Sequence, residues 1–182
     1  MADTITREEL HHRQIDLRFY NRSDGMYEVV GRLIDTKTLP FQRPLQPAPI
    51  PAGEHLHDIS VHLVLDAQLV VQQAWADMPV TPFDICPQAA SALTQLEGLR
   101  IGGGWNKKVR ELLGGAASCT HVLELLGPMA TAAWQGISPQ RLAQMQTAEG
   151  EEQRLKKIDS CYAYGADREV VARLWPQMRR EN

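Results

Sequence analysis

Three short segments of the chain carry side chains that can bind a metal ion. They are Glu54-His55-Leu56-His57-Asp58, the Cys86 segment Phe83-Asp84-Ile85-Cys86-Pro87, and Ser118-Cys119-Thr120-His121. Thiolate, neutral imidazole and carboxylate are the ligand types that Zn²⁺ accepts, and Fe²⁺ accepts a similar mixture. We therefore expect a metal site made of His57, Asp58, Cys86, Cys119 and His121.

Each of these segments lies next to a regular element. If the strand after Glu54 begins early, alternation places His55 and His57 on one face and Asp58 on the other. Cys86 and Cys119 both precede expected helices, where the helix dipole favours a thiolate. Taken singly, a cysteine in this position is more often a small buried hydrophobe. Cys119 and His121 are two residues apart, and on a helix they would diverge by about 200°, so we expect no direct nucleophile and base pair.

A second polar group comes from the N-terminal part of the chain. It consists of Arg13, Arg22, Arg32, Asp35 and Lys37. Beside a metal, such cations would orient an anionic substrate, while Asp35 and Asp58 would serve as acid or base groups. Alternatively, these are ordinary outward residues of a half-exposed sheet.

Two hairpins are expected to position these residues. Apolar and polar residues alternate from Ile15 to Phe19, and a turn at Ser23-Asp24-Gly25 leads into a return strand that ends near Lys37. A second alternating run starts at Ile59 and turns at Asp66-Ala67-Gln68. The proline-rich stretch 38–54 between the hairpins is expected to be a crossing loop, because proline cannot join a ladder.

The second half of the chain changes to helical spacing. Apolar residues recur every three or four positions over Ala89–Leu96, Lys107–Leu113, Val122–Trp134 and Glu169–Trp175. The charged stretch Glu149–Lys157 is expected to be an exposed helix or linker. Strands followed by helices predict the α+β class, with one antiparallel sheet covered by helices on one face. We expect residues 1–182 to form a single domain, divided into a hairpin at 12–37, a loop at 38–54, a core at 55–137 and a helical extension at 138–182.

The composition limits the function further. The chain has 182 residues, 43% hydrophobic and 23% charged, with a formal net charge of -3, which is an ordinary globular balance with no basic face for nucleic acid. No apolar run approaches the roughly 20 residues of a membrane span, and the N-terminus lacks a signal-peptide core. We expect a cytoplasmic protein in which Cys86, Cys119 and Cys161 stay reduced, with Cys161 serving packing. The sequence leaves the oligomeric state open, a homo-oligomer included.

The order of the three ligand segments resembles the iron–sulfur scaffold fold of the IscU/NifU/SufU type. In that family a Cys with a nearby Asp precedes a hairpin, a second Cys follows it, and a last Cys or His-Cys pair opens a long helix. Residues 54–137 are similar to this pattern, with His57-Asp58, Cys86 and Cys119-Thr120-His121 in the corresponding places. The resemblance implies an IscU-like core with an N-terminal β extension. Because His57 stands where the scaffolds carry a cysteine, the mixed ligand set suits one Zn²⁺ or Fe²⁺ better than a sulfide cluster.

Over nearly its full length the chain also looks like an uncharacterised proteobacterial domain-of-unknown-function family. The matching stretches are His11-His12-Arg13, Asp24-Gly25, 31–37, His57-Asp58, 99–102, 119–121 with 124–128, and Ile158-Asp159-Ser160-Cys161. That family implies no specific function.

The expected function is a metal-dependent lyase or hydrolase that acts on a small oxygenated organic compound, with aromatic compounds as one candidate class. A C–C lyase of the retro-aldol type is favoured, because a metal that polarises a hydroxyl or carbonyl beside a base needs no further cofactor. Aromatic catabolism is the setting to test first. The alternative is a non-catalytic metal-binding or iron–sulfur scaffold-like protein.

Overall fold

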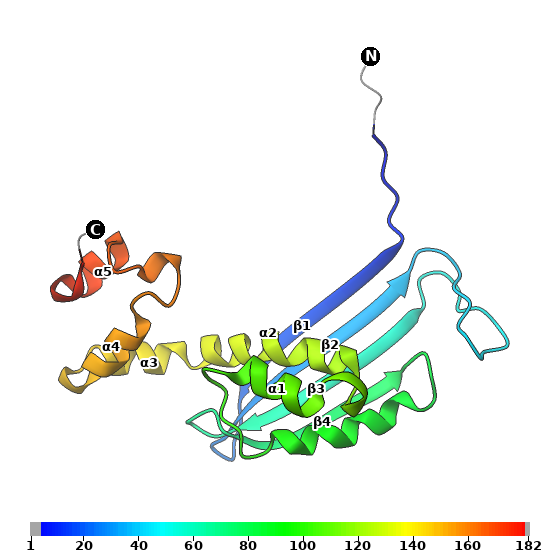
Figure 1. Ribbon diagram of the computed structural model, residues 1–182, viewed down its shortest axis with the longest axis horizontal. Coiled ribbons are helices and arrows are strands. Elements are labelled where there is room, and N and C mark those ends of the chain that lie inside the picture. The colour runs from blue at the N-terminus through cyan, green and yellow to red at the C-terminus, as the bar shows by residue number, and fades with distance from the viewer. Residues whose placement is uncertain (1–4, 181–182) are drawn as a thin grey trace. The chain divides into compact units, whose positions relative to one another are not determined.

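The chain folds into two compact units, Met1–Gly136 and Ile137–Asn182 (Figure 1). The computed structural model describes residues 5–180. The first unit contains the sheet and all of the residues that the sequence pattern marks as ligands. The single-domain organisation expected from the sequence stays a prediction.

The first unit is built on a four-stranded antiparallel sheet with the strands in the order β1-β2-β3-β4. The strands are β1 (His11–Asn21), β2 (Tyr27–Lys37), β3 (His55–Leu65) and β4 (Val71–Val80). The first turn is closed by a hydrogen bond from the Gly25 N–H to the Arg22 carbonyl, and Gly25 has a φ of 81°, a conformation that glycine adopts without steric cost. The expected α+β class, with its two hairpins in one antiparallel sheet, is confirmed.

The sheet has one buried face, and its register aligns the apolar residues of neighbouring strands. Val29 is opposite Leu63 and Leu33 is opposite Ile59, and all four side chains are fully buried. Burying an aliphatic side chain of this size contributes about 1.5–3 kcal/mol. Since side chains alternate along a strand, the odd-numbered residues from 29 to 35 on β2 all point to this covered face.

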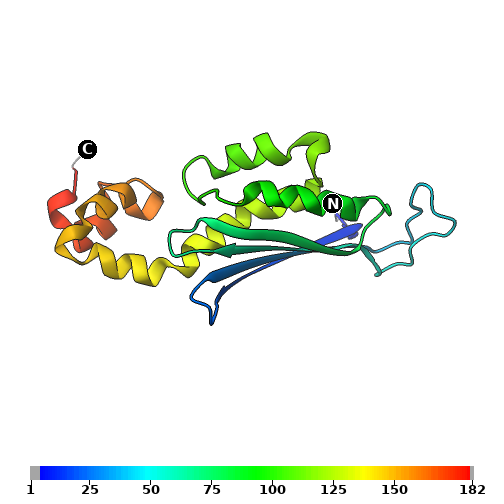
Figure 2. The ribbon, with the colours of Figure 1, turned by 90° about the horizontal axis from the view of Figure 1, so that it is seen from below.

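Helices cover that face (Figure 2). The long helix α2 (Thr120–Gly136) packs on β1, β2 and β3, and α1 (Trp105–Leu113) packs beside α2. The approach of α2 is close, because a Cβ built at Gly31 would lie 2.8 Å from the Met129 Sδ. The segment η1 (Cys86–Leu96) packs along β4, so the helix expected over Ala89–Leu96 is present, and its type is 3₁₀.

The proline-rich loop joins β2 to β3 outside the sheet. Phe41 and Ile50 form an isolated antiparallel bridge inside it, and the Gly53 N–H donates to the Lys37 carbonyl at 2.8 Å. These contacts tie the loop to the end of the sheet at which β2 finishes and β3 begins.

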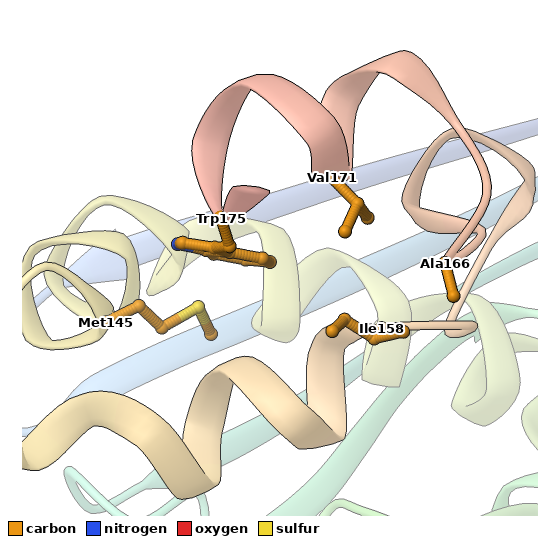
Figure 3. Close-up of a cluster of buried hydrophobic side chains, with 5 residues drawn as sticks. All are labelled: Met145, Ile158, Ala166, Val171 and Trp175. Carbon is orange, nitrogen blue, oxygen red and sulfur yellow. The ribbon is translucent and has the colours of Figure 1, made fainter. Parts of the chain in front are cut away.

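The second unit has its own small core (Figure 3). Its helices are α3 (Ser138–Met145), α4 (Glu151–Lys157) and α5 (Glu169–Leu174), with short 3₁₀ turns between them. The buried cluster consists of Met145, Ile158, Ala166, Val171 and Trp175. The helix expected at 169–175 is confirmed, and the charged stretch 149–157 contains α4. Among residues 5–180, no helix combines the length and the apolar character that crossing a bilayer would require.

Candidate metal centre

Three polar side chains lie side by side at one end of the covered face of the sheet. Arg13 on β1 is the register partner of Asp35 on β2, and Asp35 is the partner of His57 on β3. Each of them continues an apolar alternation and so lies on the covered face, where Asp35 and His57 are buried and the Arg13 side chain stays 31% exposed. The strands therefore bring a cation, a carboxylate and an imidazole together beneath the helical layer.

The start of α2 adds a second imidazole to this group. His121 is the second residue of the helix, and its Nε2 lies 3.8 Å from the Asp35 Oδ2. Its ring centroid is 3.9 Å from that of His57. Asp35, His57 and His121 each offer one ligand atom, and these atoms all lie within 4.8 Å of one another.

Asp35 is the centre of the cluster. Its side chain is 1% exposed, and it accepts hydrogen bonds from the Nε and Nη2 of Arg13, both at 2.8 Å. The His57 Nδ1 lies 2.9 Å from the Asp35 Oδ2, and the His11 Nε2 lies 3.2 Å from the Oδ1. Arg13 also binds Glu124 of α2 through Nη1, which joins β1 to the helix.

The charges around Asp35 keep it ionised. Burial by itself would raise the pKa of the Asp35 carboxyl, but the hydrogen bonds and charge of Arg13 outweigh burial, so the pKa lies below its ordinary value. Burial and the neighbouring His121 lower the pKa of His57. An ionised carboxylate beside a neutral imidazole is the protonation state that a metal site requires.

The geometry of the three groups fits one metal ion. Bonds of about 2.0–2.1 Å in a tetrahedral arrangement place neighbouring ligand atoms about 3.3 Å apart. The Asp35 Oδ2 lies 2.9 Å from His57 Nδ1 and 3.8 Å from His121 Nε2, distances that bracket this value. Arg13, His11 and His57 together use the roughly four acceptor directions of the carboxylate, so an ion bound to Oδ2 would take the place of the proton between Oδ2 and the His57 Nδ1. Two imidazoles and one carboxylate leave coordination positions for water or substrate.

Cys119 touches this cluster without being one of its three ligands. Its Sγ lies 3.7 Å from the Nδ1 of His121, within reach of a sulfur hydrogen bond. The expectation that the two side chains diverge was wrong, because α2 begins at Thr120 and the rotation per helical residue does not apply to Cys119. Burial acts to raise the pKa of Cys119, but hydrogen bonds from His121 and from the Val122 and His121 backbone lower it below the ordinary thiol value.

Asp58 and Arg32 lie on the opposite face of the sheet. Asp58 accepts two hydrogen bonds from Arg32, at 2.8 and 2.7 Å, and its pKa is lowered by that contact. A register shift between Asp35 and Thr36 pairs His55 with Thr36, and the His55 Nδ1 lies 3.7 Å from Asp58. His55 therefore accompanies Asp58 and not His57, contrary to simple alternation.

The remaining expected residues also lie apart from the cluster. Cys86 opens η1 after β4, and among residues 5–180 no group of three ligands that includes Cys86, Cys119 or Asp58 meets the 4.8 Å spacing. The Lys37 Nζ lies 5.7 Å from the centre of the Phe41 ring in the proline-rich loop. Arg22 pairs with Asp24 and Glu28 at the first turn. The structure thus joins His57 and His121 with Asp35 and Arg13 from the expected set.

Sequence reasoning missed the ligand position of Asp35 and the contacts of His11 and Glu124. A signal for Asp35 exists, since Arg13, Asp35 and His57 occupy the next same-face position after the apolar residues of β1, β2 and β3. Polar residues that extend a buried stripe on adjacent strands must meet each other. No comparable signal marks Glu124, whose contact depends on how α2 crosses the sheet.

The comparisons with known proteins agree with this division of the chain. The chain belongs to the family described as "Protein of unknown function (DUF2889)", which matches residues 11–135. That range runs from the start of β1 almost to the end of α2, so it contains the whole cluster. No curated protein and no solved structure matches the chain.

Proposed function

We propose that the first unit binds one divalent metal ion, Zn²⁺ or Fe²⁺, through Asp35, His57 and His121, and uses it to catalyse a reaction on a small organic molecule. The observation that carries this proposal is the convergence of three ligand atoms within 4.8 Å on a carboxylate that is 1% exposed. Three protein ligands are typical of catalytic sites, whereas structural zinc sites are closed by four.

The reaction we favour is C–C bond cleavage of the retro-aldol type on an oxygenated compound. A bound metal would act as a Lewis acid towards a carbonyl or hydroxyl oxygen. Arg13 would hold Asp35 in place through its paired hydrogen bonds, as partners behind the ligands do in other metal sites. His11, which is partly exposed and contacts Asp35, replaces Asp58 as the group proposed to take the substrate proton.

The proposal includes a cytoplasmic location, a small-molecule substrate and no nucleic-acid partner. The three cysteines are free, as a reducing compartment would keep them. The finer version of this proposal is a zinc or iron enzyme of aromatic catabolism, which is the setting to test first.

The rival proposal is a non-catalytic carrier of a metal or an iron–sulfur cluster, as the IscU-type resemblance implies. Cluster binding needs several thiolates, and Cys119 is the cysteine that contacts the Asp35 cluster through His121. Elemental analysis and an absorption spectrum of the untagged protein distinguish the two. One colourless equivalent of Zn²⁺, or of Fe²⁺ without sulfide, supports the enzyme, whereas a brown chromophore with acid-labile sulfide supports the carrier.

A further inference from the structure

A trough runs between α1 and α2, next to the helix that carries His121. It consists of two cavities of about 700 and 240 Å³, which share Asn106, Gly127 and Thr131 and so form one continuous space. Figure 1 shows the two helices side by side over the sheet. The proposed ligands Asp35, His57 and His121 do not line this space.

On the α2 side, the trough is lined by a glycine and a proline, Gly127 and Pro128. Gly127 has no side chain, and a Cβ there would lie 3.3 Å from the Oδ1 of Asn106, so the glycine lets the Asn106 side chain of α1 lie close to α2 at this point. Pro128 has no N–H, so the Glu124 carbonyl lacks the donor that a helix normally supplies four residues later. Pro128 also contributes an apolar ring to the lining of the larger cavity.

The charge of the trough is positive. Arg110 lines it, and its guanidinium makes no hydrogen bond or ion pair with any residue from 5 to 180. Lys107 lines the smaller cavity, and its nearest acidic group is Glu111 at 4.0 Å. Glu124 also lines the trough, but Arg13 neutralises it. The unpaired guanidinium is the fork-shaped donor that matches a carboxylate.

The walls are largely apolar. Val109 and Leu123 face the larger cavity, while Trp105 and Trp134 line the smaller one. A cleft with an apolar wall and one cation suits a small molecule with an apolar body and a single anionic group.

We infer that this trough binds a small organic carboxylate, with the carboxylate on Arg110 and the apolar body over Gly127 and Pro128. Glu124 connects the trough to the cluster, because it binds Arg13, which in turn holds Asp35. The binding of a carboxylate stands by itself, whereas its role as the enzyme's substrate rests on the proposed metal centre.

The test titrates the full-length protein with acetate, butyrate, benzoate and phenylacetate and follows tryptophan fluorescence, since Trp105 and Trp134 line the trough. Butyramide and benzamide serve as uncharged analogues. We expect at least one carboxylate to bind with a Kd of about 1 mM or tighter, and its amide about tenfold more weakly. Arg110→Gln should weaken carboxylate binding by about tenfold or more. Lys108→Gln, on the same helix and paired with Glu111, is the matched control and should leave it unchanged.

Two results would overturn the inference. One is that no carboxylate of the panel binds the wild type at about 10 mM, a concentration tenfold above the expected Kd. The other is that Arg110→Gln, folded by circular dichroism, binds as the wild type does. Metal content is measured on the same samples, so a protein that binds the carboxylate but no metal would refute the metal centre and leave the trough standing.

Discussion

Asp35 and Asp58 are a natural pair for comparison at the residue scale. Both are carboxylates of the same sheet, both accept two hydrogen bonds from an arginine, and they lie on opposite faces. They differ in the side chains that surround them. Asp35 lies beside two imidazoles, His57 and His121, whereas Asp58 lies beside His55 on the open face.

This pair gives the first prediction. Asp35→Asn should abolish metal binding, because the site loses the one anionic ligand among its three ligand side chains. Asp58→Asn should keep one equivalent of metal, since Asp58 faces away from the site. Metal content after dialysis, measured by elemental analysis, decides this. Equal metal loss in both variants would mean that the ligand set has been misassigned.

The second prediction concerns acid stability. The folded pKa of Asp35 lies below its ordinary value of 3.8, so its ionised form stabilises the fold above that pH, and the contribution is lost as the pH falls through the folded pKa. Asp35→Asn should cost about 1–3 kcal/mol at pH 7. In urea unfolding of metal-free protein, the gap between wild type and variant should shrink below about pH 4. A gap that does not change with pH would contradict the account.

The sequence predicted which residue types form the site, but it predicted only in part which of these residues lie together. His57 and His121 stood out because imidazoles near strand and helix starts are typical ligands. Asp35 was expected to be an acid or base group, although it lies two residues after Leu33 on β2 and therefore points to the same buried face. Cys86 was expected among the metal ligands but does not belong to the group of Asp35, His57 and His121. The sequence does not determine the path of residues 81–85, which sets the position of Cys86 after β4.

At the scale of elements, the position of α2 determines whether His121 reaches Asp35. The helix lies close to β2 because Gly31 leaves room for Met129, whose Sδ would be 2.8 Å from an added Cβ. Helix position and ligand geometry are therefore linked through one glycine.

The third prediction follows from this close approach. Gly31→Ala should destabilise the protein by about 1–3 kcal/mol, because an extra methyl must displace the fully buried side chain of Met129. Gly103→Ala is the control, since its Cβ would meet nothing within 4 Å. Thermal unfolding of both variants provides the measurement. If Gly31→Ala is as stable as Gly103→Ala, α2 does not pack as closely as described.

The elements themselves were largely predictable. Alternation and turn residues defined both hairpins, because one buried face imposes a period of two on each strand. The helix period located α1, α2 and α5. It could not distinguish the 3₁₀ geometry of η1 from an α-helix, since apolar spacings of three and four residues fit both. The short helix α3 carries only one buried residue, Met145, so its periodic signal is weak.

At the scale of the whole molecule, the chain contains a unit that bears the site and a second unit with its own core. The family match ends at residue 135, just before the boundary at Gly136. The chemistry we propose therefore belongs to the part of the chain that defines the family.

The fourth prediction separates the two units. Trp175→Ala should destabilise the second unit by about 3–5 kcal/mol, because Trp175 is 3% exposed in its small core. Metal binding should be unchanged, since every proposed ligand lies in the first unit. Calorimetry together with metal analysis measures both effects, and Leu174→Ala, at a position that is 45% exposed, is the control. Loss of metal in Trp175→Ala would show that the site needs the second unit.

The central claim is that one divalent ion binds between Asp35, His57 and His121. Calorimetric titration of metal-free protein with Zn²⁺ and with Fe²⁺ under anaerobic conditions tests it most directly, with His121→Ala and the opposite-face control His55→Ala in parallel. The account predicts one site per chain in the wild type and in His55→Ala, and a loss of affinity of about 100-fold or more in His121→Ala. Wild-type protein that takes up neither metal, or His121→Ala that binds as tightly as His55→Ala, would contradict it.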